Sequence, residues 1–419
     1  MDINVIKQVI LRQQEMLKGV KLIRRNFDFE ESMNYVFVGI RRAGKSYLLY
    51  QYVQQLLSNG HGVEEVLFIN FEDERLSDIT KDDLHLIVDA YREMFPYNPY
   101  IFLDEIQNVD GWEHFARRLA DEKYRVMVTG SNAKMLGREI ASTLGGRYML
   151  KEVSPFDFAE YLKYKGIILP VHWELSPIRA DIARMSQEYL YGGGLAESFD
   201  LRDKHDWHQA LYERILLADI VVRNKIRNDR SLRLLVRKLA ESVMQPMSVK
   251  RLQGVMQSDG TKITRETINE YVDYLHTSYL TFSIQNYTDS LSERNTIQKH
   301  YFYDNGILNL FILQPETKLL ENVVAITLYR KYGERLMYYN KNVELDFYVP
   351  SEGRIVQVSY SIADLSTRQR EFAAIRKCSP FLNPKTVQIV TMNEEMQVKD
   401  NGMRIDVIPL YKWLLKADD

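Results

Sequence analysis

Residues 35–50, with the sequence YVFVGIRRAGKSYLLY, decide the fold of this chain. The apolar residues 35–38 predict a short buried strand, and the apolar-periodic segment LLYQYVQQLL predicts a helix. Between them lies the pattern GxxxxGKS, at residues 39–46. This spacing between a strand and a helix predicts a phosphate-binding loop; the alternative is a plain glycine turn with a chance Lys-Ser pair.

The chemistry of this loop follows from its residue types. Gly39 and Gly44 let the backbone turn so that successive N–H groups point at phosphate oxygens, and the positive end of the helix dipole points to the same place. Lys45 supplies a charge for the β- and γ-phosphates, and Ser46 supplies a hydroxyl ligand for Mg²⁺. The residues expected to bind the nucleotide are Gly39, Ile40, Arg41, Arg42, Ala43, Gly44, Lys45, Ser46 and Tyr47.

An acidic pair follows another apolar segment. In the sequence YIFLDE, at residues 100–105, Asp104 and Glu105 end a predicted strand. Because Asp104 stands at the carboxyl end of a predicted parallel strand, we expect it beside the phosphate loop, where it would hold Mg²⁺ together with Ser46. Glu105 is expected to polarise the attacking water as general base. Gln107 and Asn108 are candidates for shaping the water site.

Two further residues are predicted to reach the γ-phosphate. Asn132 follows the predicted strand RVMVT and is expected to orient the hydrolytic water, with a turn or a helix cap as its alternative role. Arg147, in the segment GGR, is the strongest candidate for an arginine finger in cis or on a neighbouring subunit, ahead of Arg138 and Arg223. The alternative for each arginine is a surface ion pair. An arginine acting between subunits would require a homo-oligomer.

Composition narrows the classes of function. The 419 residues suffice for roughly two to four domains. With 45% hydrophobic and 27% charged residues, the chain is expected to form packed cores rather than remain disordered. A net charge of −2 gives no global basic field for nucleic acid, although it is compatible with a local basic face.

The sequence also indicates a compartment. A single cysteine, Cys378, excludes an intramolecular disulfide framework and a multi-cysteine zinc site. No apolar run approaches the roughly 20 residues that span a membrane, and residues 1–10 are too polar for a signal segment. We therefore expect a cytoplasmic protein with no membrane partner.

Two short predicted helices, 249–256 and 268–277, precede strand-like segments at 279–284 and 299–303. This order suggests a winged helix-turn-helix, which would contact double-stranded DNA through the start of its second helix. The residues expected there are Arg265, Thr267 and Asn269. The alternative is a helical lid or protein-binding module, because winged helices also bind proteins.

Carboxylates recur in the C-terminal part of the chain. A predicted helix over 319–332 precedes predicted strands at 335–339, 343–349 and 354–359. Acidic residues clustered across such a hairpin could hold Mg²⁺ for phosphodiester cleavage. The residues of this second candidate site are Glu321, Glu344, Asp346 and Gln357.

Several motifs together resemble one family. The segments GIRRAGKS, FINFED, YIFLDEIQ, GWEHFARRLAD, TGSNAKML and GGRYMLKEVSPFDFAEYL are similar to those of prokaryotic AAA+-type P-loop ATPases. A weaker similarity continues through YGGGLAES, LYERILLADIVVRNKI and ETINEYVDYLHTSYL to VELDFYV and IVQVSYS. By this resemblance Lys45 and Ser46 match the Walker A pair, Asp104 and Glu105 match Walker B, Asn132 matches the sensor and Arg147 the Gly-Arg position.

The resemblance implies an α/β P-loop NTPase with a parallel sheet, followed by an α-rich winged-helix domain and a small α/β domain similar to restriction-endonuclease-like nucleases. The implied domains are residues 1–165 (ATPase), 166–229 (helical connector or lid), 230–310 (winged helix) and 311–419 (nuclease-like). The last domain departs from the nuclease pattern, because Ser359 stands where such nucleases carry a lysine. A structural or DNA-contacting role without cleavage is therefore expected for it. Lys377 and Arg368, on the next predicted helix, are the candidates to take the place of the missing lysine.

These observations predict an Mg²⁺-dependent ATPase whose nucleotide state controls the C-terminal domains on double-stranded DNA or on a protein partner. ATP and Mg²⁺ are the implied cofactors, and the preference for ATP over GTP rests on the resemblance. Two alternatives stay open. One is a nucleotide-gated regulatory or scaffold module with negligible turnover, and the other is an ATPase-coupled nuclease.

Overall fold

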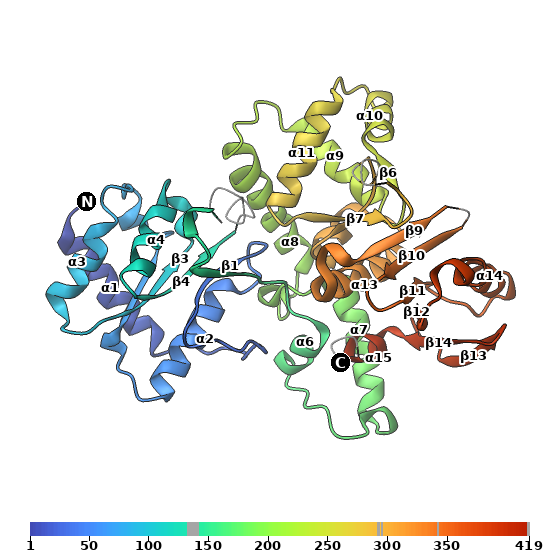
Figure 1. Ribbon diagram of the computed structural model, residues 1–419, viewed down its shortest axis with the longest axis horizontal. Coiled ribbons are helices and arrows are strands. Elements are labelled where there is room, and N and C mark those ends of the chain that lie inside the picture. Colours follow the sequence, from blue (N-terminus) through green and yellow to red (C-terminus); the bar gives the residue numbers. More distant parts are fainter. Residues whose placement is uncertain (132–141, 291–293, 295, 342, 417–419) are drawn as a thin grey trace. The chain divides into compact units, whose positions relative to one another are not determined.

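The computed structural model describes residues 1–131, 142–290, 294, 296–341 and 343–416 (Figure 1). The contacts within the chain divide it into two compact units. The N-terminal unit comprises Met1–Ser154 and Thr277–Tyr279, and the C-terminal unit comprises Pro155–His276 and Leu280–Asp419. Within the described residues, no helix has the length and apolar character needed to span a bilayer.

The N-terminal unit is built on a parallel five-stranded sheet with the order β2-β3-β4-β1-β5. Its strands are β1 (Asn34–Val38), β2 (Val66–Asn70), β3 (Tyr100–Asp104), β4 (Arg125–Gly130) and β5 (Tyr148–Glu152). The first four are almost wholly buried, as their runs of β-branched and aromatic residues predict for a sheet covered on both faces. The predicted parallel-sheet α/β P-loop fold is confirmed.

Helices precede and connect these strands. Their bounds are α1 (Ile3–Leu17), α2 (Lys45–Ser58), α3 (His85–Met94) and α4 (Trp112–Asp121). The first helix packs against α3 and β2, while α2 and α4 both contact β4. The apolar face of α1 is fully covered, because Ile6, Val9 and Ile10 have no exposed surface.

The strand order decides where the functional side chains meet. Strand β4 lies between β1, which leads into the phosphate-binding loop, and β3, which ends at Asp104. Leu103 is level with Val128, and Val38 is level with Gly130. The carboxyl ends of β1, β4 and β3 therefore meet at one edge of the sheet, with the end of β4 in the middle.

The C-terminal unit begins with helices and continues as a mixed helical and sheet segment (Figure 1). Its first segment contains α6 (Phe158–Tyr164), α7 (Ile178–Gly192), α8 (Lys204–Arg214) and the π-helix η7 (Ile215–Val222). The later helices are α9 (Arg230–Glu241), α10 (Val249–Ser258), α11 (Arg265–Thr277), α12 (Asn305–Leu308), α13 (Glu316–Tyr332), α14 (Leu365–Leu382) and α15 (Leu410–Lys416). Helix α6, which the sequence analysis grouped with the ATPase domain, belongs to this unit.

A nine-stranded mixed sheet runs through the C-terminal unit in the order β13-β14-β12-β11-β10-β9-β7-β8-β6. Its strands are β6 (Met247–Ser248), β7 (Thr281–Asn286), β8 (Ile297–Phe302), β9 (Met337–Asn340), β10 (Glu344–Val349), β11 (Arg354–Val358), β12 (Thr386–Thr391), β13 (Met396–Asp400) and β14 (Met403–Pro409). Parallel pairing of β7 with β9 joins the two segments that the sequence analysis assigned to separate domains.

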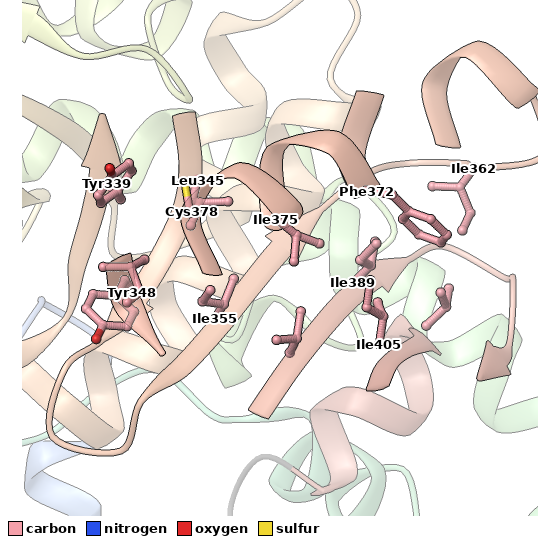
Figure 2. Close-up of a cluster of buried hydrophobic side chains, with 13 residues drawn as sticks. Tyr339, Leu345, Tyr348, Ile355, Ile362, Phe372, Ile375, Cys378, Ile389 and Ile405 are labelled. Carbon is pink, nitrogen blue, oxygen red and sulfur yellow. The ribbon is translucent and has the colours of Figure 1, made fainter. Parts of the chain in front are cut away.

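The core of the C-terminal α/β segment lies between α14 and the strands β9 to β14 (Figure 2). Its buried residues are Tyr339, Leu345, Tyr348, Ile355, Ile362, Phe372, Ile375, Cys378, Leu382, Val387, Ile389, Ile405 and Val407. The single cysteine is part of this core, and burial raises the pKa of its thiol to about 11. Cys378 is therefore a packing residue with little thiolate character.

The triple glycine at 192–194 forms a tight loop closed over Asp304. The Gly194 N–H donates to Asp304 Oδ2 at 2.7 Å. Gly193 has a φ of 72°, and a Cβ atom there would lie 2.3 Å from the same carboxylate oxygen. Asp304 also accepts the Ile307 N–H and thereby caps α12. Only glycine at position 193 allows this close approach.

We expect Gly193→Ala to lower the free energy of unfolding by about 3 kcal/mol, because the new methyl group must displace the Asp304 carboxylate and strain the backbone. Chemical denaturation measures this loss. Gly254→Ala in α10 is the matched control: its Cβ would meet no atom within 4 Å, and it should stabilise the helix by about 0.5–1 kcal/mol. Equal stability changes in the two variants would contradict the proposed contact.

Candidate functional site

The phosphate-binding loop joins β1 to α2, and its conformation explains its glycines. Gly39 has a φ of 148°, and a Cβ atom there would lie 2.2 Å from the Val153 carbonyl oxygen. Gly44, which precedes α2, has a φ of 93°. Arg42 also has a positive φ, 70°, which is uncommon for a residue other than glycine. The loop thus keeps a backbone path that other sequences would adopt only with strain.

Lys45 is buried at the start of α2, with 3% of its surface exposed. Its Nζ donates to the carbonyl oxygens of Gly39 and Ile40, both at 3.1 Å. The same ammonium lies 3.9 Å from Glu105 Oε1. The charge is therefore held over the loop, where a phosphate oxygen would compete with these acceptors.

The remaining predicted nucleotide ligands lie around the loop with different surroundings. Ile40 and Ala43 are buried, whereas half of the Tyr47 side chain is exposed. Arg41 forms an ion pair with Glu72 Oε1 at 2.8 Å. Glu72 follows β2, so this pair links the loop to a neighbouring strand end.

Three side chains meet where the ends of β3, β4 and the loop converge. Ser46 Oγ donates to Asp104 Oδ1 at 3.0 Å. Thr129 Oγ1 donates to the same oxygen and accepts the backbone N–H of Glu105 at 2.9 Å. Thr129 was not singled out by the sequence analysis, although its place at the end of the predicted strand RVMVT could have indicated it.

The charge of Asp104 is poorly compensated within the chain. Burial raises the pKa of Asp104 to about 6, and the neighbouring Glu105 adds to the shift, while Thr129, Ser46 and Lys45 oppose it. A hydroxyl and a carboxylate oxygen are ligands that Mg²⁺ prefers. A buried carboxylate that resists ionisation also gains from a nearby cation. The residues present therefore fit a magnesium ion.

Glu105 is held in an unusual backbone conformation, with φ 53° and ψ 41°. Its Oε2 accepts a hydrogen bond from Gln107 Nε2 at 2.5 Å, and the same nitrogen lies 3.3 Å from Ser131 Oγ. Gln107 Oε1 is buried and has no hydrogen-bond partner in the part of the chain that the structure describes. Gln107 thus lies beside Glu105, whereas Asn108 donates to the Phe71 carbonyl oxygen.

Of the predicted sensor and finger residues, the structure describes Arg147 and Arg223. Asn132 and Arg138 lie outside the described residues. Arg147 precedes β5 and pairs with Asp121, at the amino end of a five-residue strand whose other end lies beside the loop. The strand alone separates the two by about 17 Å. Arg223 follows η7 in the C-terminal unit.

Arg25 holds the phosphate-binding loop in place through hydrogen bonds to the main chain. Its buried guanidinium donates to the carbonyl oxygens of Ala43 at 3.1 Å and Ser154 at 3.0 Å. Its backbone N–H donates to Gln51 Oε1 in α2 at 2.8 Å. Arg25 therefore braces the loop, the first helix after it and the end of the unit.

The second candidate site is also brought together, in the C-terminal unit. Glu321 of α13 and Glu344 and Asp346 of β10 surround Lys299 of β8. Gln357 of β11 accepts the Asp346 N–H at 3.1 Å. Lys299 was missed because its strand lies outside the segment in which a nuclease-like motif is sought.

The predicted recognition residues begin α11. Thr264 caps this helix by accepting the Thr267 N–H at 3.2 Å. Arg265 and Asn269 are exposed, and Arg265 Nε donates to Gln253 Oε1 of α10 at 3.1 Å. Arg265 and Thr267 border an open depression that residues of α10 and α11 help to line.

Comparison with known proteins identifies the N-terminal unit. Residues 31–162 match the profile of an AAA domain, and residues 184–318 match a domain of unknown function (DUF8612). The chain is 31% identical over 429 aligned positions to the uncharacterized protein MJ1544 of Methanocaldococcus jannaschii, covering 98% of this chain and 95% of that protein. The chain belongs to the family of this archaeal protein.

The AAA domain match over residues 31–162 of this chain confirms the general prediction of a nucleotide-binding P-loop ATPase. A second relative, an uncharacterized protein of Haemophilus influenzae, is 27% identical over 393 residues and covers 91% of this chain and 94% of its own length. Both alignments extend through the AAA domain and the C-terminal unit. The two parts therefore occur together in each relative.

Solved structures give weaker likenesses. The Walker-type ATPase PABY2304 of Pyrococcus abyssi is 13% identical, with 71% of this chain and 99% of that chain covered and a TM-score of 0.41. The Orc1 protein of Aeropyrum pernix, solved in complex with DNA, is 15% identical, with 76% and 93% covered and a TM-score of 0.29. Likenesses at this level carry no information on the partner of this chain.

The raised pKa of Asp104 predicts a pH-dependent stability with a definite sign. The folded chain retains the Asp104 proton between about pH 4 and pH 6, where the unfolded chain has lost it, so stability should fall as pH rises through this window. Relative to Asp104→Asn, we expect the wild type to lose about 3 kcal/mol from pH 4 to pH 7. Urea unfolding of the nucleotide-free proteins measures this difference, and a difference that does not vary with pH would contradict it.

Proposed function

We propose that this protein is an Mg²⁺-dependent ATPase whose nucleotide state controls its C-terminal unit. The observation that carries the proposal is the convergence of Ser46, Asp104 and Thr129 at the end of the sheet, next to Lys45 and Glu105. Each group has the chemistry that phosphoanhydride hydrolysis requires, and the AAA domain match over residues 31–162 supports the same activity.

In this mechanism the chain acts by positioning and electrostatics. The backbone N–H groups of the loop and Lys45 neutralise the phosphate oxygens. Ser46 and Asp104 would hold Mg²⁺, which supplies further charge neutralisation when bound with ATP. Glu105 orients a water molecule and accepts its proton, and Thr129 keeps the Glu105 backbone and the Asp104 carboxylate in register through its hydroxyl group.

A nucleotide-gated module with negligible turnover is the second candidate, and one observation favours it. The Glu105 carboxylate accepts a hydrogen bond from Gln107 and lies within 3.9 Å of the Lys45 ammonium. A general base held by these two partners is less available to a water molecule. ATP must draw Lys45 toward its phosphates before Glu105 can serve as the base, so the two candidates differ in whether that exchange occurs.

We expect Lys45→Ala to lower ATP affinity by at least about 100-fold, because the buried ammonium is the main charge over the loop. Isothermal titration with Mg²⁺ and ATP measures this change, and Lys18→Ala, at an exposed lysine after α1, is the control with unchanged affinity.

Glu105→Gln should keep ATP binding and lower kcat by about 100- to 10,000-fold. Equal turnover in wild type and Glu105→Gln would favour the binding module instead.

We further propose that residues 230–310 form a winged helix within the C-terminal unit, which begins at Pro155. The order α9-β6-α10-α11-β7-β8 supports it, because β8 lies between β6 and β7 in antiparallel pairing, as in a wing. We also propose that Arg147 acts as an arginine finger at the nucleotide site of a neighbouring copy of the chain. At the far end of β5, it is too distant from the phosphate-binding loop of its own chain.

A protein is the favoured partner of the proposed winged helix. Its second helix, α11, exposes Arg265 but also Glu266, Glu270 and Asp273. These acids would repel a phosphate backbone, which attracts clustered lysine and arginine. The exposed helix is therefore better suited to a mixed-charge protein surface than to DNA.

We expect double-stranded DNA to change the ATPase rate by less than about twofold at roughly 0.15 M salt, and Arg265→Ala to leave that result unchanged. An ATPase assay with and without DNA, together with a salt titration of DNA binding, provides the measurement. Tight, salt-dependent binding that Arg265→Ala weakens about tenfold would instead identify DNA as the partner.

A further inference from the structure

Lys299 occupies the centre of the acidic cluster in the C-terminal unit. Its Nζ lies 2.8 Å from Glu344 Oε1, 3.5 Å from Glu321 Oε1 and 3.5 Å from Asp346 Oδ1. The lysine side chain has no exposed surface, and its ammonium also lies 5.7 Å from the centre of the Tyr338 ring. A compact cation is thus enclosed by three carboxylates and an aromatic face.

Other protein donors also form hydrogen bonds to oxygens of this cluster. Asp346 Oδ2 accepts the Val358 N–H at 2.9 Å. Glu321 Oε1 accepts the Tyr301 hydroxyl at 2.7 Å. Gln357 Oε1, which a nuclease-like site would offer to a metal, accepts the Asp346 N–H. Asp346 Oδ2, Glu321 Oε1 and Gln357 Oε1 therefore already accept hydrogen bonds from other groups of the protein.

The electrostatics keep the lysine charged. Burial alone would lower the pKa of Lys299, but the charges of Glu321, Asp346 and Glu344 outweigh it and raise the pKa above its ordinary value. Burial and the nearby Glu321 raise the pKa of Asp346 well above its usual range, and Lys299 opposes this shift. Among the described residues, no group of three acidic, histidine or cysteine side chains is arranged to hold a metal ion.

We propose that the Lys299 ammonium is the permanent cation of this cluster, so that the site binds no divalent metal and supports no metal-dependent phosphodiester cleavage. The nuclease-like resemblance implies a magnesium ion here, and the residues present do not fit one. A divalent ion at 2.0–2.6 Å from these oxygens would face an ammonium that is itself within 3.5 Å of all three. Like charges at such a distance repel strongly inside a protein.

A groove connects the acidic cluster with solvent. A groove of about 710 Å³ reaches Glu321, Glu344 and Asp346 and is also lined by Lys377. Ions can therefore enter from solvent. Lys377 is exposed and, in the described structure, no ion pair joins it to the cluster, so it does not take the place that the sequence analysis suggested for it.

The first experiment counts Mn²⁺ ions bound by the full-length, nucleotide-free chain, with electron paramagnetic resonance as the readout. We expect wild type and Asp346→Asn to bind the same number, because the substitution removes a carboxylate that holds no metal. One more Mn²⁺ in the wild type than in Asp346→Asn would overturn the proposal, since the ammonium would then move aside for a metal.

The second experiment removes the internal cation. Lys299→Met keeps the length of the side chain and removes its charge, so we expect one additional bound Mn²⁺ and an Mn²⁺-dependent rise in melting temperature. The double variant Lys299→Met/Asp346→Asn should lose both effects, and Lys377→Met should behave as the wild type. A folded Lys299→Met that gains no Mn²⁺ would overturn the proposal. A Lys299→Met chain that folds only with Mn²⁺ would support the proposal. If this variant does not fold at all, the comparison of bound Mn²⁺ in wild type and Asp346→Asn decides between the outcomes.

Discussion

One buried carboxylate, that of Asp104, organises the N-terminal unit. It accepts hydrogen bonds from Ser46 at the start of α2 and from Thr129 at the end of β4, and Thr129 in turn accepts the Glu105 N–H. These contacts exist because β4 lies between β1 and β3. If β1 and β3 were neighbours, Asp104 would have no threonine between it and the loop. The strand order thus gives the predicted metal ligand a fixed orientation while leaving its charge uncompensated.

The negative charges of Asp104 and Asp346, at the two buried acidic sites described here, are neutralised in different ways. Around Asp104, the nearest ammonium is that of Lys45, which also donates to two loop carbonyl oxygens and can be attracted by phosphate. Around Asp346, the ammonium of Lys299 is enclosed by carboxylates on three sides. A cation that has alternative acceptors permits ligand exchange, whereas a cation enclosed by its counter-charges resists it. This contrast is consistent with nucleotide chemistry at the first site and a structural role for the second.

One continuous sheet connects the helical segment of the C-terminal unit with its α/β segment. Helix α9 contacts β8 and α10 contacts β6. The pairing of β7 with β9 extends this sheet to the α14 core. A change imposed on the helical segment would therefore be carried into the α/β segment through main-chain hydrogen bonds. In the proposed function, this connection lets one nucleotide state set the presentation of the whole unit to a partner.

The sequence by itself determined the parts whose signal is local. The strand-loop-helix context of GxxxxGKS, the apolar run ending in Asp104-Glu105 and the parallel-sheet class could all be predicted, because spacing along the chain controls the loop path and the strand ends. Tertiary structure alone decided that Thr129 bridges Asp104 and Glu105, that Arg25 supports the loop, that Arg147 lies at the far end of β5, and that Lys299 enters the acidic cluster. Each of these contacts joins residues distant in sequence, and strand order and long-range pairing, which no local pattern encodes, place them together.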